Sequence, residues 1–313
     1  MYHFGWAGPK QENDNMDLLA SQANSPLVDV SMLDWNAISQ EVHGNTDTNP
    51  EGKRFAFWDS VVKLTGKHLP NTNQLLGDCV AAGTEMGIEY LLADEIVREG
   101  DLEAYRPVYR PWIYGIGRVY IGKNRIRGDG SLLSWQMEGL KEYGVLAEDE
   151  VGIPPYSTST GRQWGSSAAA LNPWKEKAAS QTIDEFIEIT SFADLAKCVI
   201  IGHMFPVIAS SQGFQMELRH DRTQNCSYFV PSGTWMHLMH IPAVDFRSKN
   251  PRLYVGNQWG YSAHRGQLDG PDGGGWVSAE FFDKWVRKSD TSCMAFKKFN
   301  AWKLKRPSFN MID

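Results

Sequence analysis

Residues 74–81, QLLGDCVA, carry the chain from a loop into its longest helical pattern. Apolar side chains recur at helical spacing from Cys79 to Val97, and Gly100 provides a stop. A thiol in the first turn of a helix faces unpaired amide groups and the positive end of the helix dipole, and both lower its pKa. The junction therefore predicts a nucleophilic thiol at Cys79, with the first helical amides available to an oxyanion. The alternative is a small buried hydrophobe.

The residues around this thiol leave two structural questions open. Asp78 stands where an N-cap belongs, and its carboxylate then turns toward the amides of the first turn. Pointing inward, the same carboxylate raises the pKa of the neighbouring thiol. Gly83 and Gly87 lie one turn apart on one helix face, which predicts that another backbone packs closely against the helix there.

The order of the remaining patterns predicts the fold class. Helical patterns cover about 111–121, 134–143 and 192–201, a long loop is expected over 154–180, and strand patterns follow from 206 onward. Helices first and strands last favour an α+β fold with two lobes.

The same patterns suggest how the chain is divided. We expect a polar N-terminal arm over 1–53, with a short strand near 27–30, and a C-terminal tail over 296–313. The catalytic domain then spans 54–295. Its helical lobe covers about 75–180, and an antiparallel β-rich lobe covers about 181–295.

A nucleophilic thiol needs a base, and the chain offers eight histidines. Six lie in polar, loop-like or glycine-rich sequence with no neighbouring motif to argue a role: His3, His43, His68, His203, His220 and His264. His237 and His240 begin a late strand, and Asn257 ends the next one. Three positions apart on a strand, the two histidines point to opposite faces. Pro242 denies this strand a ladder hydrogen bond and predicts an edge or a bulge.

The order of Cys79, His237 and Asn257 resembles that of the papain-like cysteine peptidases. Four segments carry the resemblance. Residues 74–81 are similar to the family's glutamine loop, which ends in Gly-Ser-Cys, and residues 128–156 are similar to its glycine-containing groove wall, helix, Tyr-Gly turn and Pro-Tyr. Residues 195–207 are similar to its Gly-Pro-Val strand, and residues 237–260 to its His strand and the Asn-Ser-Trp-Gly that follows. The Gly-Asp-Cys form, without a clear inhibitory propeptide, is similar to members encoded by bacteriophages and bacteria.

The resemblance implies a role for each matched residue. Cys79 is the nucleophile, His237 the base, and Asn257 orients the imidazole. The family's register favours His237 over His240. Trp259 covers the His–Asn contact and borders the substrate, although a core tryptophan is the alternative.

Two further features of the site are implied with alternatives. The family's oxyanion glutamine lies six residues before the cysteine, where this chain has Asn73; we favour Gln74, five before, with Asn73 left open. Gly128, Asp129 and Gly130 form a groove wall that pairs with an extended peptide, and Asp129 favours a basic side chain. An ordinary glycine turn is the alternative for these three residues.

Composition argues against other classes of protein. The formal charge is −6 and no lysine or arginine run forms a stripe, so nucleic acid is not an expected partner. The N-terminus lacks a secretory signal and the apolar stretches are too short to span a membrane, so we expect a cytoplasmic protein. The four cysteines show no close pairing, and we expect neither a metal nor a cofactor.

These features predict a cysteine hydrolase, foremost a peptidase, that acts on a peptide or protein. The alternative is a structural or adaptor protein of a virus particle, which contacts other virion proteins and keeps a papain-like fold with weak or lost activity.

Overall fold

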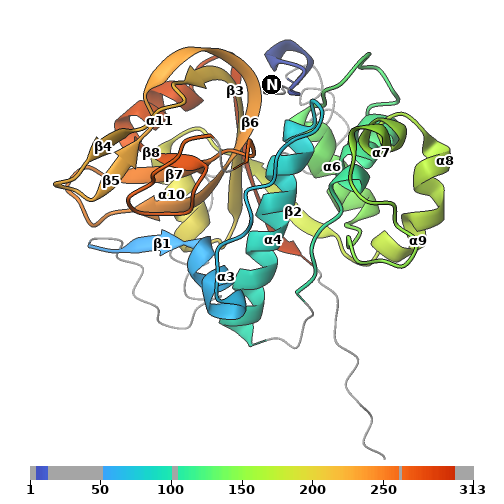
Figure 1. Ribbon diagram of the computed structural model, residues 1–313, viewed down its shortest axis with the longest axis horizontal. Coiled ribbons are helices and arrows are strands. Elements are labelled where there is room, and N and C mark those ends of the chain that lie inside the picture. The colour runs from blue at the N-terminus through green and yellow to red at the C-terminus, as the bar shows by residue number, and fades with distance from the viewer. Residues whose placement is uncertain (1–4, 13–51, 101–104, 261–262, 300–313) are drawn as a thin grey trace, which may run out of the picture.

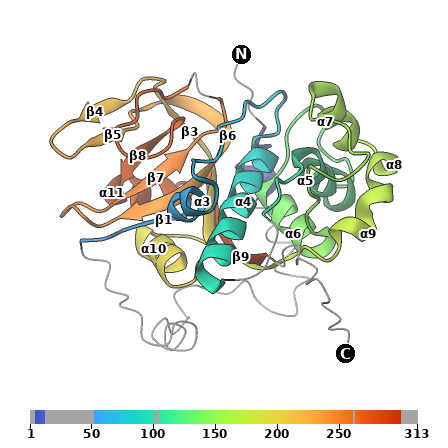
Figure 2. The same cartoon turned by 60° about the horizontal axis from the view of Figure 1, so that its bottom comes forward.

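Helix α4, Cys79–Glu99, forms the centre of the molecule. It ends as predicted, because Gly100 adopts φ 68° and its N–H bonds to the Ile96 carbonyl. The computed structural model describes residues 5–12, 52–100, 105–260 and 263–299. The strand expected near 27–30 lies outside them. Figures 1 and 2 show a sheet on one side of α4 and shorter helices on the other, which confirms the predicted α+β fold with two lobes.

The helical lobe contains more helix than the sequence patterns indicate. Its segments are α5 (Arg110–Gly115), continued by the π-helical turn η2 (Ile116–Ile121), α6 (Leu133–Tyr143), α7 (Thr158–Trp164), α8 (Ala168–Leu171), the 3₁₀ turn η3 (Asn172–Trp174) and α9 (Lys175–Ala178). The long loop predicted over 154–180 is therefore wrong in part. Its small and polar residues hide short helices, the first of which is capped by the Ser157 side chain.

The second lobe is built on one sheet. Its strands are β1 (Arg54–Ala56), β2 (Ile183–Glu188), β3 (Phe205–Phe214), β4 (Arg219–Asp221), β5 (Cys226–Tyr228), β6 (Pro231–Asp245), β7 (Arg252–Gly256), β8 (Gly274–Ser278) and β9 (Thr291–Phe299). The order is β2-β9-β3-β6-β7-β8-β5-β4, with β1 on β6, and the pairs are antiparallel except β5 with β8. Helices α3 (Phe57–Thr65), α10 (Phe192–Ile200) and α11 (Ala279–Val286) complete this lobe.

Strand β6 is irregular where Pro242 lies. Its register against β7 shifts between His240 and Ala243, which agrees with the bulge predicted from the missing N–H. The shift separates the part of β6 that carries His237, which pairs with Ser210 of β3, from the end that pairs with β1.

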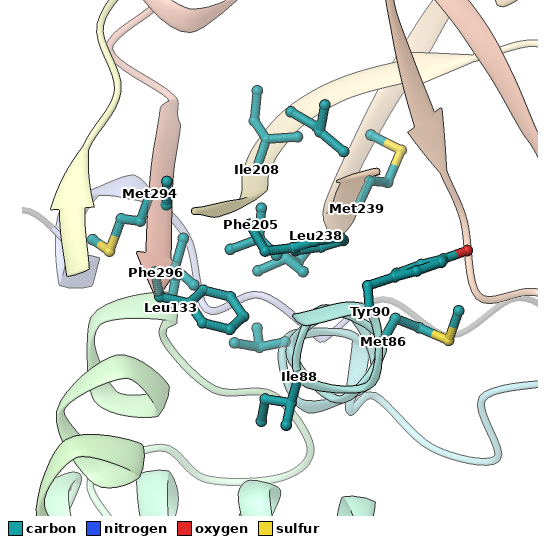
Figure 3. Packing of buried hydrophobic residues seen from close by; sticks show 14 of the residues in the cluster. Met86, Ile88, Tyr90, Leu133, Phe205, Ile208, Leu238, Met239, Met294 and Phe296 are labelled. Atoms are coloured by element: carbon teal, nitrogen blue, oxygen red, sulfur yellow. The ribbon is translucent and has the colours of Figure 1, made fainter. Parts of the chain in front are cut away.

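Helix α4 packs against side chains of the sheet that include Leu238, Phe205 and Phe296 (Figure 3), and two of its glycines allow the close approach. A Cβ added at Gly83 would lie 2.2 Å from Leu238 Cδ2, and one at Gly87 would lie 2.6 Å from Phe296 Cζ. Side chains of the sheet, rather than the backbone predicted from the sequence, therefore fill these positions. This close approach brings β6 across the first turns of α4.

Gly83→Ala is expected to destabilise the protein by about 1–3 kcal/mol through overpacking against Leu238. Alanine's better helix propensity, about 1 kcal/mol, acts in the opposite direction. Chemical denaturation measures the net effect, and the double variant with Leu238→Val should recover part of the loss. A net gain in stability for Gly83→Ala would show that the contact is not close.

Candidate active site

Cys79 begins α4 between the two lobes and is completely buried. Burial raises the pKa of its thiol to about 12, although hydrogen bonds with the backbone of Leu238, Gly5 and Val80 act in the opposite direction. The lowered thiol pKa predicted from the helix start is therefore wrong for this conformation, because desolvation outweighs the amides and the dipole.

Strand β6 brings a histidine to the same place. His237 immediately precedes Leu238, and its Nε2 lies 2.8 Å from Asn257 Oδ1, with both side chains buried. An amide oxygen only accepts, so Nε2 carries the ring proton and Nδ1 is the basic nitrogen. Burial lowers the pKa of His237 to about 4. In this conformation the thiol and the imidazole are thus both neutral.

His240 belongs to the core. Its Nδ1 contacts Gln258 Nε2, and its ring centroid lies 6.0 Å from that of Tyr90 and 6.3 Å from that of Phe205. The two histidines of β6 are therefore separated as strand alternation predicts, and His237 is the one next to Asn257.

Trp259 joins the histidine to the oxyanion loop. Its ring centroid lies 4.6 Å from that of His237, and its Nε1 donates to Gln74 Oε1 at 3.0 Å. Only 3% of Trp259 is exposed, so it covers the His237–Asn257 contact from water, rather than lining an open groove.

The structure separates the two candidates for the oxyanion amide. Gln74 is buried and its Nε2 lies 3.4 Å from Asp78 Oδ1, beside the start of α4. The Asn73 side chain instead packs against Gly260, where an added Cβ would lie 2.2 Å from Asn73 Oδ1. This placement favours Gln74.

Asp78 occupies the N-cap position of α4, as predicted, but its side chain makes no capping hydrogen bond. It points inward, where Oδ2 accepts a hydrogen bond of 2.6 Å from Tyr156 Oη. Arg110 lies over the Tyr156 ring at 4.9 Å and donates to Glu85 at 2.6 Å. Burial raises the pKa of Asp78 and the Arg110 charge lowers it, while the charge of Asp78 raises the pKa of Cys79. Asp78 thus opposes thiolate formation, which is the second of its predicted alternatives.

Asp78→Asn is expected to lower the pH at which Cys79 becomes reactive by about one unit, because it removes a charge next to the thiol and keeps an acceptor for Tyr156. The pH dependence of iodoacetamide labelling at Cys79 measures the shift. Asp221→Asn, at an exposed carboxylate with its own local partners, is the matched control. An unchanged or higher midpoint in Asp78→Asn would contradict this assignment.

An N-terminal segment, residues 5–12, covers the site, which the sequence did not indicate. It lies between β6 and α6 (Figures 1 and 2). Trp6 N donates to Met236 O at 3.3 Å, Ala7 N donates to Ser131 O at 2.9 Å, and Ser131 N donates to Gly5 O at 2.7 Å. Gly5 lies so close to the loop before Cys79 that an added Cβ would be 2.0 Å from the Gly77 carbonyl oxygen.

Glu12 fixes the other end of this segment to the helical lobe. Its carboxylate accepts hydrogen bonds of 2.6 Å from Leu133 N and from Ser134 N, the first two amides of α6, and one of 3.1 Å from Trp6 Nε1. Burial raises the pKa of Glu12, and these donors act in the opposite direction. An acidic side chain at a helix N-terminus is favoured by the helix dipole, so Glu12 stabilises the covered conformation.

Gly128, Asp129 and Gly130, the residues predicted to form a groove wall, lie in a loop that the chain itself holds in place. Arg118 donates to the carbonyls of Gly128 and Gly130 and holds this loop in place. Asp129 pairs with Arg162 at 3.1 Å, so its charge already has a partner on the chain. The residue that pairs with the covering segment is Ser131, one position beyond the predicted three. A polar serine after two glycines carries no signal for this role.

Other kinds of site are not seen in the described part of the chain. No group of three or more His, Cys, Asp or Glu side chains there is arranged to hold a metal ion. No helix among the same residues is long and apolar enough to cross a membrane.

The chain is similar to known proteins in its structure but not in its sequence. No protein-family model matches the sequence, and a search of curated proteins finds no match. Xylellain, a cysteine protease from Xylella fastidiosa, matches with a TM-score of 0.51 and 14% identity over 78% of this chain and 85% of its own. Procathepsin B S9 from Trypanosoma congolense matches with a TM-score of 0.49 and 11% identity over 78% and 77%. Procathepsin L 3 of Tenebrio molitor matches with a TM-score of 0.45 and 11% identity over 91% and 86%.

The class of protein follows from the fold and the site together. The chain has the two-lobed papain-like fold, shared with xylellain. Where the lobes meet, it places a cysteine at the start of the central helix and a His–Asn pair on the adjoining strands.

Proposed function

We propose that this protein is a cysteine hydrolase that cleaves amide bonds in peptides or proteins through an acyl-enzyme. One observation carries the proposal. His237 Nε2 is hydrogen-bonded to Asn257 Oδ1 at 2.8 Å, and the backbone of Leu238, the next residue of β6, contacts the Cys79 thiol. Because this hydrogen bond uses Nε2, the basic nitrogen Nδ1 of the imidazole is left to accept the proton of the thiol.

The first half of the reaction forms the acyl-enzyme. Cys79 gives its proton to His237 Nδ1, and the thiolate attacks the substrate carbonyl carbon. The resulting oxyanion accepts hydrogen bonds from the Cys79 N–H and the Gln74 side chain. The imidazolium then protonates the leaving nitrogen as the C–N bond breaks, which leaves an acyl group on sulfur. Asn257 holds the imidazole in place throughout.

The second half releases the product. His237 takes a proton from water and the hydroxide attacks the thioester. The C–S bond then breaks to give a carboxylic acid and a thiolate, and His237 returns its proton to the sulfur to restore the free thiol. Catalysis requires that residues 5–12 leave the site, because they cover Cys79. The backbone groups that they occupy, on Ser131 and Met236, then pair with an extended substrate.

Covalent labelling tests the proposal. The protein is incubated with an irreversible thiol-directed peptidase inhibitor, and the adduct is mapped by mass spectrometry. We expect labelling at Cys79 that is lost in His237→Ala. Equal, slow labelling of Cys79, Cys198, Cys226 and Cys293, all of which are buried, would contradict it.

The kinship with propeptide-less members from bacteriophages and bacteria stays a prediction, as does the alternative of a virion structural protein. The complete Cys79, His237 and Asn257 set favours the hydrolase, because assembly alone does not need a buried histidine that is hydrogen-bonded to an asparagine. Electron microscopy of an assembled particle tests the alternative, which requires a fixed, symmetric position for the chain.

A further inference from the structure

His264 lies on the far side of Asn257 from His237. Its Nε2 is 3.1 Å from Asn257 Nδ2, while Asn257 Oδ1 is 2.8 Å from His237 Nε2. One amide therefore joins two imidazoles, and all three side chains are buried. No sequence motif points to His264, which stands in a glycine-rich turn.

The two ends of the amide are chemically distinct. Nδ2 only donates, so it bonds to His264 only when Nε2 of that ring is an unprotonated acceptor. This contact directs Oδ1 toward His237, and Oδ1 requires the proton of His237 on Nε2. The basic nitrogen of His237 is then Nδ1. Rotating the amide by half a turn would place a donor against Nε2 and favour the opposite tautomer.

The surroundings keep His264 neutral and in place. Burial lowers the pKa of His264 to about 4, with the backbone of Met216 acting in the opposite direction. Phe229 meets its ring edge-on at 4.6 Å, and Trp259 stacks on it at 6.4 Å. His264 also adopts φ 51°, a left-handed conformation that residues other than glycine adopt rarely. Backbone strain of this kind is typical of functional sites.

We propose that His264 is a positioning residue for catalysis, which acts through Asn257 to select the tautomer of His237 that accepts the proton of Cys79. The inference rests on the proposed function for its catalytic consequence. The effect of His264 on the tautomer of His237 can be measured whether or not the protein turns over a substrate.

Nitrogen NMR of the histidine rings in the full chain tests the selection directly. In the wild type we expect His237 entirely as the Nε2–H tautomer. His264→Phe keeps a ring but removes the acceptor, and it should produce a mixture with the Nδ1–H form. His264→Gln offers an amide oxygen to Asn257 and should restore the wild-type signal. An unchanged His237 tautomer in His264→Phe overturns the proposal, and His264→Leu decides the same question if the phenylalanine variant does not fold.

Kinetics provide the second measurement. His264→Phe is expected to reduce kcat about tenfold or more with little change in KM, because a misplaced base slows chemistry rather than binding. In an Asn257→Ala background the same substitution should have no further effect. An equal loss in both backgrounds would show a merely structural role. If the protein hydrolyses nothing even when Gly5→Ala displaces residues 5–12, the proposed function fails, while the NMR result still decides the role of His264.

Discussion

Gly5→Ala is expected to increase the rate of Cys79 labelling and of substrate hydrolysis by about 10- to 100-fold. The new methyl group would lie 2.0 Å from the Gly77 carbonyl oxygen and 2.9 Å from Asp78 N, and these backbone atoms cannot rotate away as a side chain can. A clash of about 1–3 kcal/mol in the covered conformation shifts the population toward the open one by that factor. The rate of labelling with a thiol-directed inhibitor, compared with wild type, measures the change.

Lys10→Ala is the matched control, because Lys10 belongs to the same segment and is exposed. We expect it to leave the rate unchanged. If Gly5→Ala labels Cys79 no faster than Lys10→Ala does, residues 5–12 do not limit access to the thiol.

His237→Ala and Cys79→Ala are each expected to abolish hydrolysis, with a loss on the order of 1,000-fold or more. Cys79 supplies the electron pair that attacks the carbonyl and His237 moves the proton, so removing either side chain removes its step. The loss is measured as kcat in the Gly5→Ala background, where the site is open.

His240→Ala distinguishes this loss from a general effect of losing a buried histidine. His240 is equally part of β6, but it contacts Gln258 and core rings instead of Asn257. It should lower stability while sparing kcat in the folded fraction. A loss of kcat in His240→Ala as large as in His237→Ala would contradict the assignment of the base.

The fold was predictable where local patterns carry it. Helix α4 has clear start and stop signals at Cys79 and Gly100, and the strand patterns near His237 and Asn257 place these residues on neighbouring strands. Segments in which apolar residues do not recur at a regular spacing were less predictable. Helix α3, for example, follows the three-residue strand β1 directly and has no side-chain cap at its start.

The parts of the site that the sequence missed depend on contacts between distant segments. Glu12 bonds to the start of α6 more than 120 residues later, and Asp78 turns toward Tyr156 rather than its own helix. His264, which itself has a left-handed backbone conformation, contacts Asn257 from a turn. No local spacing encodes these contacts. The predicted direction of the thiol pKa was wrong for the same reason, because the complete burial of Cys79 is not visible in the sequence around the helix start.

The acyl-enzyme itself tests the central claim most directly. The Gly5→Ala variant is mixed with an activated peptide ester, quenched in acid within milliseconds to seconds, and analysed by intact mass and peptide mapping. We predict that one acyl group, of the mass of the substrate's carbonyl portion, is attached to Cys79, and that His237→Ala does not acquire it. Hydrolysis without an acyl group on Cys79, or acyl groups spread over the four cysteines, would contradict the account.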